Sequence, residues 1–479
     1  MPAGMPDRHA IAPDLLGRFA AIVGERNALT ADSDTAPFLV ERRGLHFGRT
    51  PMVLRPGSVD EVSRILRLAT ETRTPVVPQG GNTGLVGGQI PDGSGTALLM
   101  SLSRLDRVRE VDPVSNTMTV EAGMVLDRIH QVADDHDRQF PLSLASQGSC
   151  QIGGNLSSNA GGTAVLAYGN ARELCLGLEV VLPTGEVLDD LRKLKKDNTG
   201  YDLKNLFIGA EGTLGVITAA VLKLFPKPRG HEVAWVGLAS PEAALALYGI
   251  AADRTGASLT GFELIQDRAL QFVLSHLPGA IRPVAGDHPW HVLVDVSSNR
   301  SSEDANGLIH DILEAALASG VLADAAIAAS LGQQRAFWAL REGISESQRP
   351  EGWSIKHDIS VPVAAIPAFI AEAAGAVQEV SPGARVVCFG HMGDGNLHYN
   401  ITQPVGADPQ AFLALYPEMN DAVHGLVRRY GGSISAEHGI GVQKRGELIA
   451  TAPPVAIDLM QRIKAAFDPA GIMNPGKVI

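Results

Sequence analysis

Short apolar runs separated by turn residues fill the chain from about residue 50 to residue 228. Clusters of Gly, Asn, Asp and Pro separate these runs, which include residues 76–77, 97–100 and 178–182. That spacing is typical of strands joined by turns, and residues 59–71 and 125–134 between them have the periodicity of helices. The pattern therefore predicts an α+β domain over residues 50–228.

The pattern changes after residue 228, where longer Ala-rich segments replace the short runs. Helical periodicity extends over residues 241–252, 302–318 and 366–379, and strand-like runs lie at residues 291–296 and 385–389. A second domain over residues 229–430 is the economical interpretation. It leaves residues 1–49 as an N-terminal helical segment and residues 431–479 as a C-terminal segment, which contains one more helix before its final turns.

Composition and charge narrow the function classes. The chain has 479 residues, is 45% hydrophobic and has a formal net charge of −12. An acidic chain lacks the clustered Lys and Arg that nucleic acids require, so no nucleic-acid partner is expected. Its three cysteines (Cys150, Cys175 and Cys388) are widely spaced and are interpreted as buried thiols in a reducing compartment. With neither an apolar leader in residues 1–11 nor 18 consecutive apolar residues, we expect a cytoplasmic protein without a transmembrane segment.

Two glycine-rich segments give the first chemical signal. They are residues 78–88 (PQGGNTGLVGG) and 146–162 (SQGSCQIGGNLSSNAGG). Glycine lets the backbone approach a ligand closely and point several N–H groups at one anion. Gly and Asn are also common turn residues, so either segment alone could be only a loop. Neither fits the Rossmann or P-loop pattern, but two such segments in one domain favour a long phosphate-bearing ligand.

These segments, with residues 211–218 (EGTLGVIT), resemble the FAD-binding domain of the vanillyl-alcohol oxidase and p-cresol methylhydroxylase flavoprotein superfamily. Residues 390–400 (GHMGDGNLHYN), 435–441 (SAEHGIG) and 474–477 (NPGK) resemble its D-lactate and D-2-hydroxyglutarate dehydrogenase branch. The resemblance extends from about residue 50 to residue 477. It implies an α+β protein with a two-subdomain FAD-binding domain, an α+β substrate (cap) domain, and a C-terminal helical segment that returns to the FAD domain and completes the active site.

The resemblance also implies which residues contact FAD. They are Pro78, Gly80, Gly81, Asn82, Thr83, Gly84, Gly148, Gly153, Gly154, Asn155 and Asn159, with Ile217 and Asn474 nearer the flavin. Some superfamily members carry a histidine in the first loop that bonds covalently to the flavin. The matching position here is Asn82, so FAD is expected to be bound non-covalently.

A pair of histidines gives the second chemical signal. Strand-like runs flank Asp394-Gly395, a dipeptide that favours a two-residue hairpin turn. That turn would place His391 opposite His398, with Cβ atoms about 4.5–5.5 Å apart, close enough for both rings to bind one metal. Single strand histidines are usually structural, so the pair alone leaves a metal-free alternative open. In the family pattern Glu437 supplies a carboxylate, and two His with one carboxylate suit a catalytic divalent metal, for which zinc is expected.

A third group of residues suits an anionic substrate. A helix predicted over residues 334–348 would place Arg341 and Ser345 on one face, and the strand that follows would place Lys356 and Asp358 on one side. From spacing alone, Arg341 and Lys356 would be solvated surface charges. The family resemblance implies instead that Arg341, Ser345, Lys356, Asn400 and His438 contact substrate, although a Thr is expected where Ser345 stands. Two cations favour a dicarboxylate such as 2-hydroxyglutarate or malate.

The resemblance implies oxidation of D-2-hydroxyglutarate or D-malate to the 2-oxo acid by hydride transfer to FAD, with His438 as general base. The expected electron acceptor is external, namely an electron-transfer flavoprotein, a quinone or a cytochrome. A D-lactate dehydrogenase, a glycolate oxidase subunit, an ether-lipid synthase-like transferase and a non-catalytic flavoprotein electron carrier stay open as alternatives. An iron-dependent oxygenase also uses two His and one carboxylate but does not need the glycine-rich loops. Neither the identity of the metal nor the oligomeric state, for which a homodimer is one option, follows from the sequence.

Overall fold

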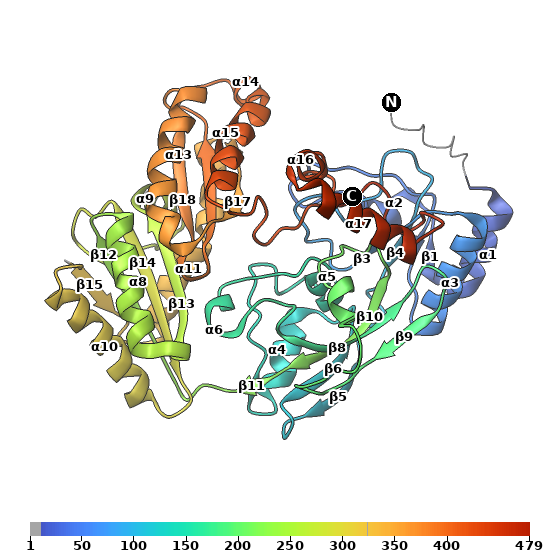
Figure 1. Cartoon of the computed structure of the whole chain (residues 1–479), viewed down its shortest axis with the longest axis horizontal. Coiled ribbons are helices and arrows are strands. Elements are labelled where there is room, and N and C mark those ends of the chain that lie inside the picture. The colour runs from blue at the N-terminus through green and yellow to red at the C-terminus, as the bar shows by residue number, and fades with distance from the viewer. Residues whose placement is uncertain (1–10, 323) are drawn as a thin grey trace. The chain divides into compact units, whose positions relative to one another are not determined.

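The computed structural model describes residues 11–322 and 324–479, and the chain divides into two compact units (Figure 1). Unit 1 consists of Met1–Ala160, Asn170–Pro226 and His438–Ile479, and unit 2 of Gly161–Gly169 and Lys227–Glu437. Two boundaries differ from those predicted, because residues 161–169 group with unit 2 and the C-terminal return begins at His438. The expected lack of a leader concerned residues 1–11, of which residues 1–10 lie outside the described residues, as does the start of the predicted segment 1–49.

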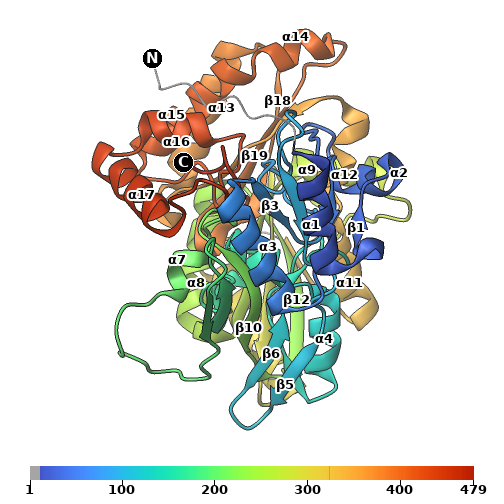
Figure 2. The ribbon, with the colours of Figure 1, turned by 90° about the vertical axis from the view of Figure 1, so that its right-hand side faces the viewer.

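The first sheet of unit 1 leads into the first glycine-rich loop. Its strands follow in the order β1 (Ala28–Leu29), β2 (Val53–Leu54), β4 (Leu98–Ser101) and β3 (Val76–Gln79). Helix α3 (Val59–Thr72) connects β2 to β3, is capped by the Ser58 hydroxyl, and packs beside α1 (Pro13–Val23) (Figure 2). Strands β2, β4 and β3 are parallel. The loop after Gln79 therefore leaves the carboxyl edge of this parallel sheet, where α/β proteins commonly bind ligands.

The second sheet of unit 1 is antiparallel. Its strands follow in the order β5 (Val108–Asp112), β6 (Thr117–Glu121), β10 (Val216–Lys223), β8 (Cys175–Val181) and β9 (Val187–Asp190). The smaller elements are α2 (Asp32–Thr35), α4 (Leu126–Asp134), α7 (Lys204–Phe207), and the ribbon of β7 (Arg138–Gln139) with β11 (Phe225–Pro226). Helix α5 (Ile152–Ser157), formed by the second glycine-rich segment, lies against β10. This contact brings the second segment to the strand that carries Ile217.

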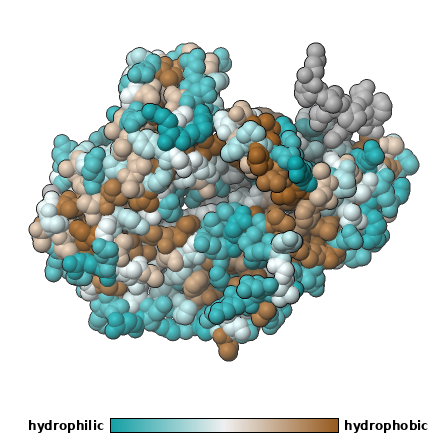
Figure 3. Space-filling view, in the orientation of Figure 1, coloured by the Kyte–Doolittle hydropathy of each residue, from teal (hydrophilic) through white to brown (hydrophobic). Residues whose placement is uncertain are grey.

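The C-terminal residues complete unit 1. After α16 (Arg445–Thr451) and α17 (Pro454–Phe467), Met473 bridges to Val76 at the edge of β3, and the Asn474 amide donates to the Val76 carbonyl at 2.9 Å. Apolar side chains gather on the outer face of these helices, where Val455, Leu459 and Met460 are exposed (Figure 3). The return of the C-terminal segment to the first sheet is the arrangement that the family resemblance implied.

Unit 2 is built on one antiparallel sheet with helices on both faces. In the described part of unit 2 the sheet order is β15 (Asp324–Ile327), β12 (Gly230–Leu238), β14 (Trp290–Ser298), β13 (Leu259–Gln266), β18 (Arg385–His391), β19 (Asn396–Thr402) and β16 (Ser354–Ile355), with β17 (Asp358–Ser360) also on β19. The segment 161–169 contributes α6 (Val165–Tyr168), which packs against β13. Residues 161–169 therefore take part in this unit through direct contact with its central strands.

Successive side chains of each strand point to opposite faces of the sheet, and an apolar core covers each face. One core lies under α8 (Pro241–Thr255), α10 (Ser302–Ala318), α13 (Ile366–Val380) and α15 (Tyr416–Arg429), with α14 (Pro409–Ala414) nearby. The other lies under α9 (Asp267–His276), α11 (Leu331–Glu342) and α12 (Ile344–Ser347). On β19, Leu397, Tyr399 and Ile401 enter the first core. The alternate residues His398 and Asn400 therefore point to the face that carries α11.

The predicted register of the β18–β19 hairpin is wrong by two residues. His398 pairs with Phe389 rather than with His391, because residues Met392–Asp394 form a 3₁₀ turn in place of the tight two-residue turn. Gly395 ends that turn at φ +86°, and a Cβ there would meet the Val361 carbonyl at 2.3 Å. A shift by an even number of residues keeps every side chain on its original face. The two histidines therefore still share one face, as diagonal neighbours.

Residues 363–380, which include α13, are long and apolar enough to cross a membrane by length and composition. The expectation that the chain has no transmembrane segment rested on unbroken apolar runs, whereas this segment passes a test of mean hydropathy that core helices also pass. In the structure α13 packs against α15 and α8 and buries Phe369, Ala373 and Val377 in the first core of unit 2. These contacts are those of a core helix, and apolar composition suits that place equally well.

Candidate active site

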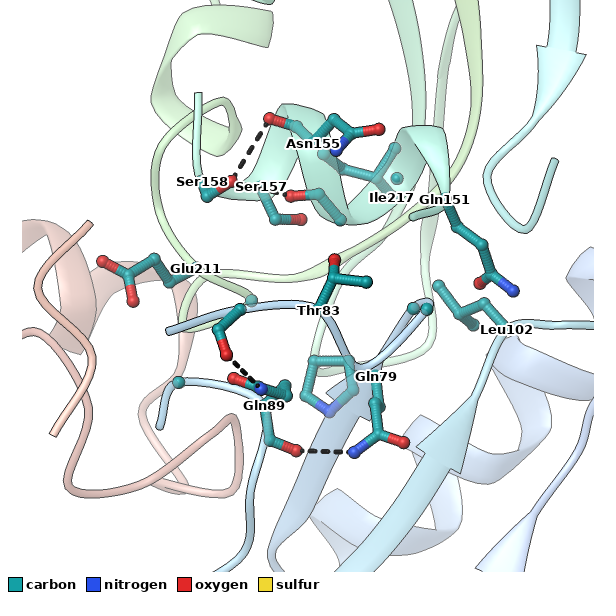
Figure 4. Close-up of a pocket in the computed structure, with 18 of the residues that line it drawn as sticks. Gln79, Thr83, Gln89, Leu102, Gln151, Asn155, Ser157, Ser158, Glu211 and Ile217 are labelled. Atoms are coloured by element: carbon teal, nitrogen blue, oxygen red, sulfur yellow. Dashed lines mark hydrogen bonds between the residues drawn. The ribbon is translucent and has the colours of Figure 1, made fainter. Parts of the chain in front are cut away.

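A cavity in unit 1 is lined by both glycine-rich segments (Figure 4). Thr83 stands on one wall and Ser157 on the opposite wall. The residues predicted to contact FAD that line this cavity are Pro78, Gly80, Gly81, Asn82, Thr83, Gly84, Gly153, Gly154, Asn155 and Ile217.

Three of the predicted FAD residues do not line the cavity. Asn159 accepts a hydrogen bond from the Arg172 amide at 3.0 Å, and Asn474 donates to the carbonyls of Gly88 and Glu211 at 2.9 and 2.8 Å. Asn474 therefore contacts two residues that line the cavity, whereas Asn159 contacts Arg172, which does not line it. Gly148 lies in an exposed turn, where a Cβ would meet nothing within 4 Å.

The glycines allow the backbones around the cavity to approach closely. A Cβ on Gly81 would lie 2.0 Å from the Ser149 carbonyl oxygen, and one on Gly153 would lie 2.7 Å from the Ala122 side chain. Inside the cavity, Gln151 Oε1 and Asn155 Oδ1 are buried and make no hydrogen bond within the described residues. These unsatisfied acceptors fit a ligand rich in hydroxyl and N–H donors, as FAD is. Four lining residues were not singled out, although all lie in motifs that were: Gln79 in the first glycine-rich segment, Gln151 and Ser157 in the second, and Glu211 in the segment 211–218.

His438 lines the same cavity, on a segment anchored by a half-buried carboxylate, that of Glu211. Glu211 accepts hydrogen bonds from the backbone amides of Ile440 and Gly441 at 2.7 and 2.8 Å. Burial raises the pKa of Glu211, and the two amide hydrogen bonds only partly oppose that shift. The amide of Val442 donates to the Val86 carbonyl at 2.9 Å, which fixes the segment at a second point. The candidate base is therefore carried on a backbone tied directly to the cavity wall.

Three candidate metal ligands come together in unit 2. The rings of His391 and His398 have centroids 5.7 Å apart, and their Nε2 atoms lie 3.6 and 3.9 Å from the carboxylate oxygens of Glu437. The donor atoms of the three residues all lie within 4.8 Å of one another. The Gly162 amide donates to Glu437 at 2.8 Å, so the end of the second glycine-rich segment helps to position this carboxylate. Two imidazoles and one carboxylate facing a common point suit a divalent metal with an open position.

The outer nitrogens of the two histidines face buried carboxylates that sequence reasoning did not assign. His391 Nδ1 lies 2.7 Å from Glu263, and His398 Nδ1 lies 4.0 Å from Asp358. Asp358 also accepts the backbone amide of Glu437 at 3.0 Å. A hydrogen-bonded carboxylate such as Glu263 holds a metal-binding histidine with Nε2 turned toward the metal, whereas the 4.0 Å between His398 and Asp358 is too long for a hydrogen bond. No local pattern could indicate Glu263, because it lies 128 residues from His391 in the sequence.

The electrostatics of the two histidines differ. Burial lowers the pKa of His391, but the Glu263 carboxylate outweighs it and raises that pKa to about 9. Burial dominates at His398 and lowers its pKa to about 4. Burial raises the pKa of Glu263, but the charges of His391 and Arg341 outweigh it and hold the pKa at about 2. Glu263 is therefore a permanent anion between a histidine and an arginine.

Arg341 lies beside this cluster. It is 7% exposed, its Nε donates to Glu263 at 2.8 Å, and its guanidinium carbon lies 4.9 Å from the centre of the Phe389 ring. Nη2 lies 2.8 Å from the same Glu263 oxygen but is not aligned for a hydrogen bond, and it has no acceptor within the described residues. A buried guanidinium whose N–H groups are not all used in hydrogen bonds is suited to bind an anion. The surface-charge interpretation of Arg341 is therefore wrong.

The other predicted substrate residues occupy different environments. The single helix predicted over residues 334–348 is interrupted at Gly343, between α11 and α12, and Ser345 is exposed. Asn400 is buried and donates to Gln348 at 3.0 Å. Lys356 is half-buried between β16 and β17, and the common register of these strands places it opposite Asn400. Unit 2 thus gathers Arg341, Lys356 and Asn400 on the sheet face of the histidine cluster, with Ser345 at the surface.

Two family models match the chain. The description "FAD linked oxidases, C-terminal domain" matches residues 227–478, which is more than half of the chain, and "FAD binding domain" matches residues 50–190. The chain belongs to the FAD-linked oxidase family. This membership makes it an FAD-dependent enzyme, and it confirms the resemblance found in the sequence motifs.

Similar proteins extend this finding. The mitochondrial D-2-hydroxyglutarate dehydrogenase of Danio rerio is 39% identical over 90% of this chain and 79% of that protein. The D-2-hydroxyglutarate dehydrogenase of Xanthomonas citri pv. viticola is 38% identical over 90% of this chain and 92% of that protein. The D-2-hydroxyglutarate–pyruvate transhydrogenase of Saccharomyces cerevisiae is 34% identical over 99% of this chain and 96% of that protein. A solved p-cresol methylhydroxylase has a TM-score of 0.75 at 16% identity, covering 97% of this chain and 96% of that one, which confirms the predicted fold.

Proposed function

We propose that this protein is an FAD-dependent dehydrogenase that oxidises D-2-hydroxyglutarate or D-malate to the 2-oxo acid, with a divalent metal, zinc, held by His391, His398 and Glu437. One observation carries the proposal: His391, His398 and Glu437 face a common point, and Arg341 of α11 beside them is buried and has unused hydrogen-bond donors. The relatives named D-2-hydroxyglutarate dehydrogenase support the same substrate class.

The spacing of the two cations supports a dicarboxylate. Arg341 lies over Phe389, which pairs with His398, whereas Lys356 falls opposite Asn400, two residues further along β19. Two residues along a strand span about 7 Å. Cations about 7 Å apart along the strand can each bind one carboxylate of a C4 or C5 diacid, whereas the single carboxylate of lactate can reach only one of them.

The chain's own residues then account for binding and proton transfer. When bound, the metal supplies a Lewis acid that acidifies the substrate hydroxyl, and FAD supplies the acceptor for the hydride from C2. His438 removes the hydroxyl proton as general base, since it directly follows Glu437 in the sequence and lines the FAD cavity. Arg341 and Lys356 hold the carboxylates, while Asn400 and Ser345 add polar contacts, so that C2 keeps one orientation.

Asn82 supports non-covalent FAD. Its side-chain amide donates to the carbonyls of Pro37 and Val40 at 3.1 and 3.0 Å, and an amide offers no nucleophile to the flavin. The electrons leave for an external acceptor, an electron-transfer flavoprotein, a quinone or a cytochrome. Pyruvate is a further candidate because of the transhydrogenase relative. The free, buried Cys150, Cys175 and Cys388 support a reducing compartment, the cytoplasm.

Anaerobic reduction of the bound flavin tests the proposal. Purified protein is mixed with D- and L-2-hydroxyglutarate, D-malate and D-lactate while the flavin absorbance is followed. The D-diacids should bleach the flavin faster than D-lactate, and the L-isomers should not bleach it. A flavin that none of these acids reduces would refute the dehydrogenase and leave the transferase or electron-carrier alternative. Re-oxidation by pyruvate or by a quinone then distinguishes the acceptors.

A further inference from the structure

Glu263 is a buried carboxylate shared by two functional groups of the proposed active site. It is 0% exposed, lies on the central strand β13, and pairs directly with His391 of β18 in the sheet register. One carboxylate oxygen lies 2.7 Å from His391 Nδ1, and the other lies 2.8 Å from Arg341 Nε. A single side chain therefore contacts both a candidate metal ligand and a candidate substrate-binding cation.

Stability alone does not explain a carboxylate at this position. Removing a carboxylate from water costs several kcal/mol, and buried ion pairs are often replaced by apolar residues without loss of stability. The neighbouring residues on β13, Leu264 and Ile265, are fully buried and apolar, so the strand has no general need for charge. Glu263 is therefore better explained by what it does for its two partners.

The two contacts fix different properties. A proton held on His391 Nδ1 by the Glu263 oxygen leaves the Nε2 lone pair free for a metal and sets the plane of the ring. The Arg341 Nε bond to the second oxygen sets the plane of the guanidinium and leaves the unspent donors of Nη2 for an anion. One rigid carboxylate thus sets the geometry of the metal site relative to the substrate cation.

We propose that Glu263 is a positioning residue that orients His391 for metal binding and Arg341 for carboxylate binding at the same time. The inference rests on the proposed function, because it assumes that His391 is a metal ligand. It predicts that the loss of Glu263 weakens metal affinity and substrate affinity together, although Glu263 touches neither ligand.

Asp267 provides a matched control. It is also a buried acid of unit 2 that contacts a histidine and an arginine, with His291 Nε2 at 2.9 Å and Arg282 Nη1 at 2.7 Å. Neither partner belongs to the proposed site. A general effect of losing a buried, ion-paired acid should therefore appear in D267N as well as in E263Q, whereas an effect on metal binding should appear only in E263Q.

The test measures zinc affinity in the FAD-loaded protein by competition with a chromophoric chelator. E263Q should bind zinc about 10–100-fold more weakly than wild type, while D267N should stay within about twofold. In steady-state assays E263Q should raise KM for the diacid more than it lowers kcat. R341A should cost much less in the E263Q background than in wild type, because the two residues act as one unit. Should E263Q fail to fold, E263D keeps the charge but is too short to reach both partners, and the same losses are expected.

Each other outcome counts against a specific statement. Zinc affinity in E263Q equal to that of wild type, or reduced equally in D267N, would overturn the positioning role and leave the proposed function intact. Full additivity of E263Q and R341A would overturn the shared role of Glu263. Wild-type protein that binds no zinc would overturn the metal assignment itself, and that result is visible before any variant is made.

Discussion

Replacement of Arg341 by Ala should affect catalysis and stability together. Loss of one partner of a buried, charge-assisted substrate contact costs about 2–5 kcal/mol, so kcat/KM should fall at least about thirtyfold. The same change leaves His391 as the remaining charged partner of the buried Glu263 within the described residues. Breaking a buried ion pair is worth about 3–5 kcal/mol when no charge remains nearby, and the remaining His391 should reduce that to about 2–4 kcal/mol.

The loss of stability and the loss of activity in R341A can be measured separately. At about 2–4 °C per kcal/mol for a domain of this size, the melting temperature of unit 2 should fall by about 4–16 °C. Anaerobic stopped-flow reduction of the flavin by D-2-hydroxyglutarate, D-malate and D-lactate gives kinetic constants at a temperature where the variant is folded. Lys356→Ala is the matched variant, because Lys356 is half-buried and lies outside the Glu263 pair. It should lose activity toward the diacids with little change in melting temperature.

Two results would refute this reasoning. Unchanged kcat/KM in R341A would show that the unspent guanidinium donors do not meet the substrate. Equal losses for D-lactate and for the diacids in both R341A and K356A would show that the cations serve only the carboxylate next to C2. The dicarboxylate assignment would then give way to the D-lactate alternative.

Three further predictions concern the cofactor, the metal and the pH dependence of stability. Acid precipitation should release the yellow flavin into the supernatant because Asn82 forms no covalent bond, and flavin retained in the pellet would contradict this. Chelation should abolish activity yet leave FAD bound, since the proposed ligands belong to unit 2 and the FAD cavity to unit 1; full activity in metal-free protein would exclude the Lewis-acid role. Burial lowers the pKa of His231, but a contact with Asp295 at 2.8 Å outweighs it and raises the pKa to about 9. A raised pKa stabilises the fold below about pH 6.5, and this stabilisation is lost as the pH rises through 9. Because the side chain is 40% exposed, we expect a loss of about 1 kcal/mol in wild type and none in H231Q, measured by urea unfolding.

The hairpin at Asp394-Gly395 shows which structural features the local sequence pattern predicts and which it does not. Alternation along residues 397–401 determined that His398 and Asn400 share a face, and this conclusion was insensitive to an even shift in register. The turn itself was mispredicted. The backbone folds Met392–Asp394 into a 3₁₀ turn whose geometry depends on contacts with residues far away in the sequence, such as Val361 behind Gly395.

The sequence by itself indicated the FAD domain. Its glycine-rich segments are continuous stretches of sequence, so they can be recognised without knowing which parts of the chain meet in the fold. It also determined the identities of His391, His398 and Glu437 as candidate ligands, although their metal stays a prediction. Only the tertiary structure decided that Glu263 joins His391 to Arg341, because the order of strands places β13 beside β18 across 128 residues of sequence. The same holds for Gly162, which leaves the FAD loop to support Glu437. The partners of a side chain depend on which strands become neighbours in the sheet. The alternation of apolar and polar residues along one strand does not reveal those neighbours.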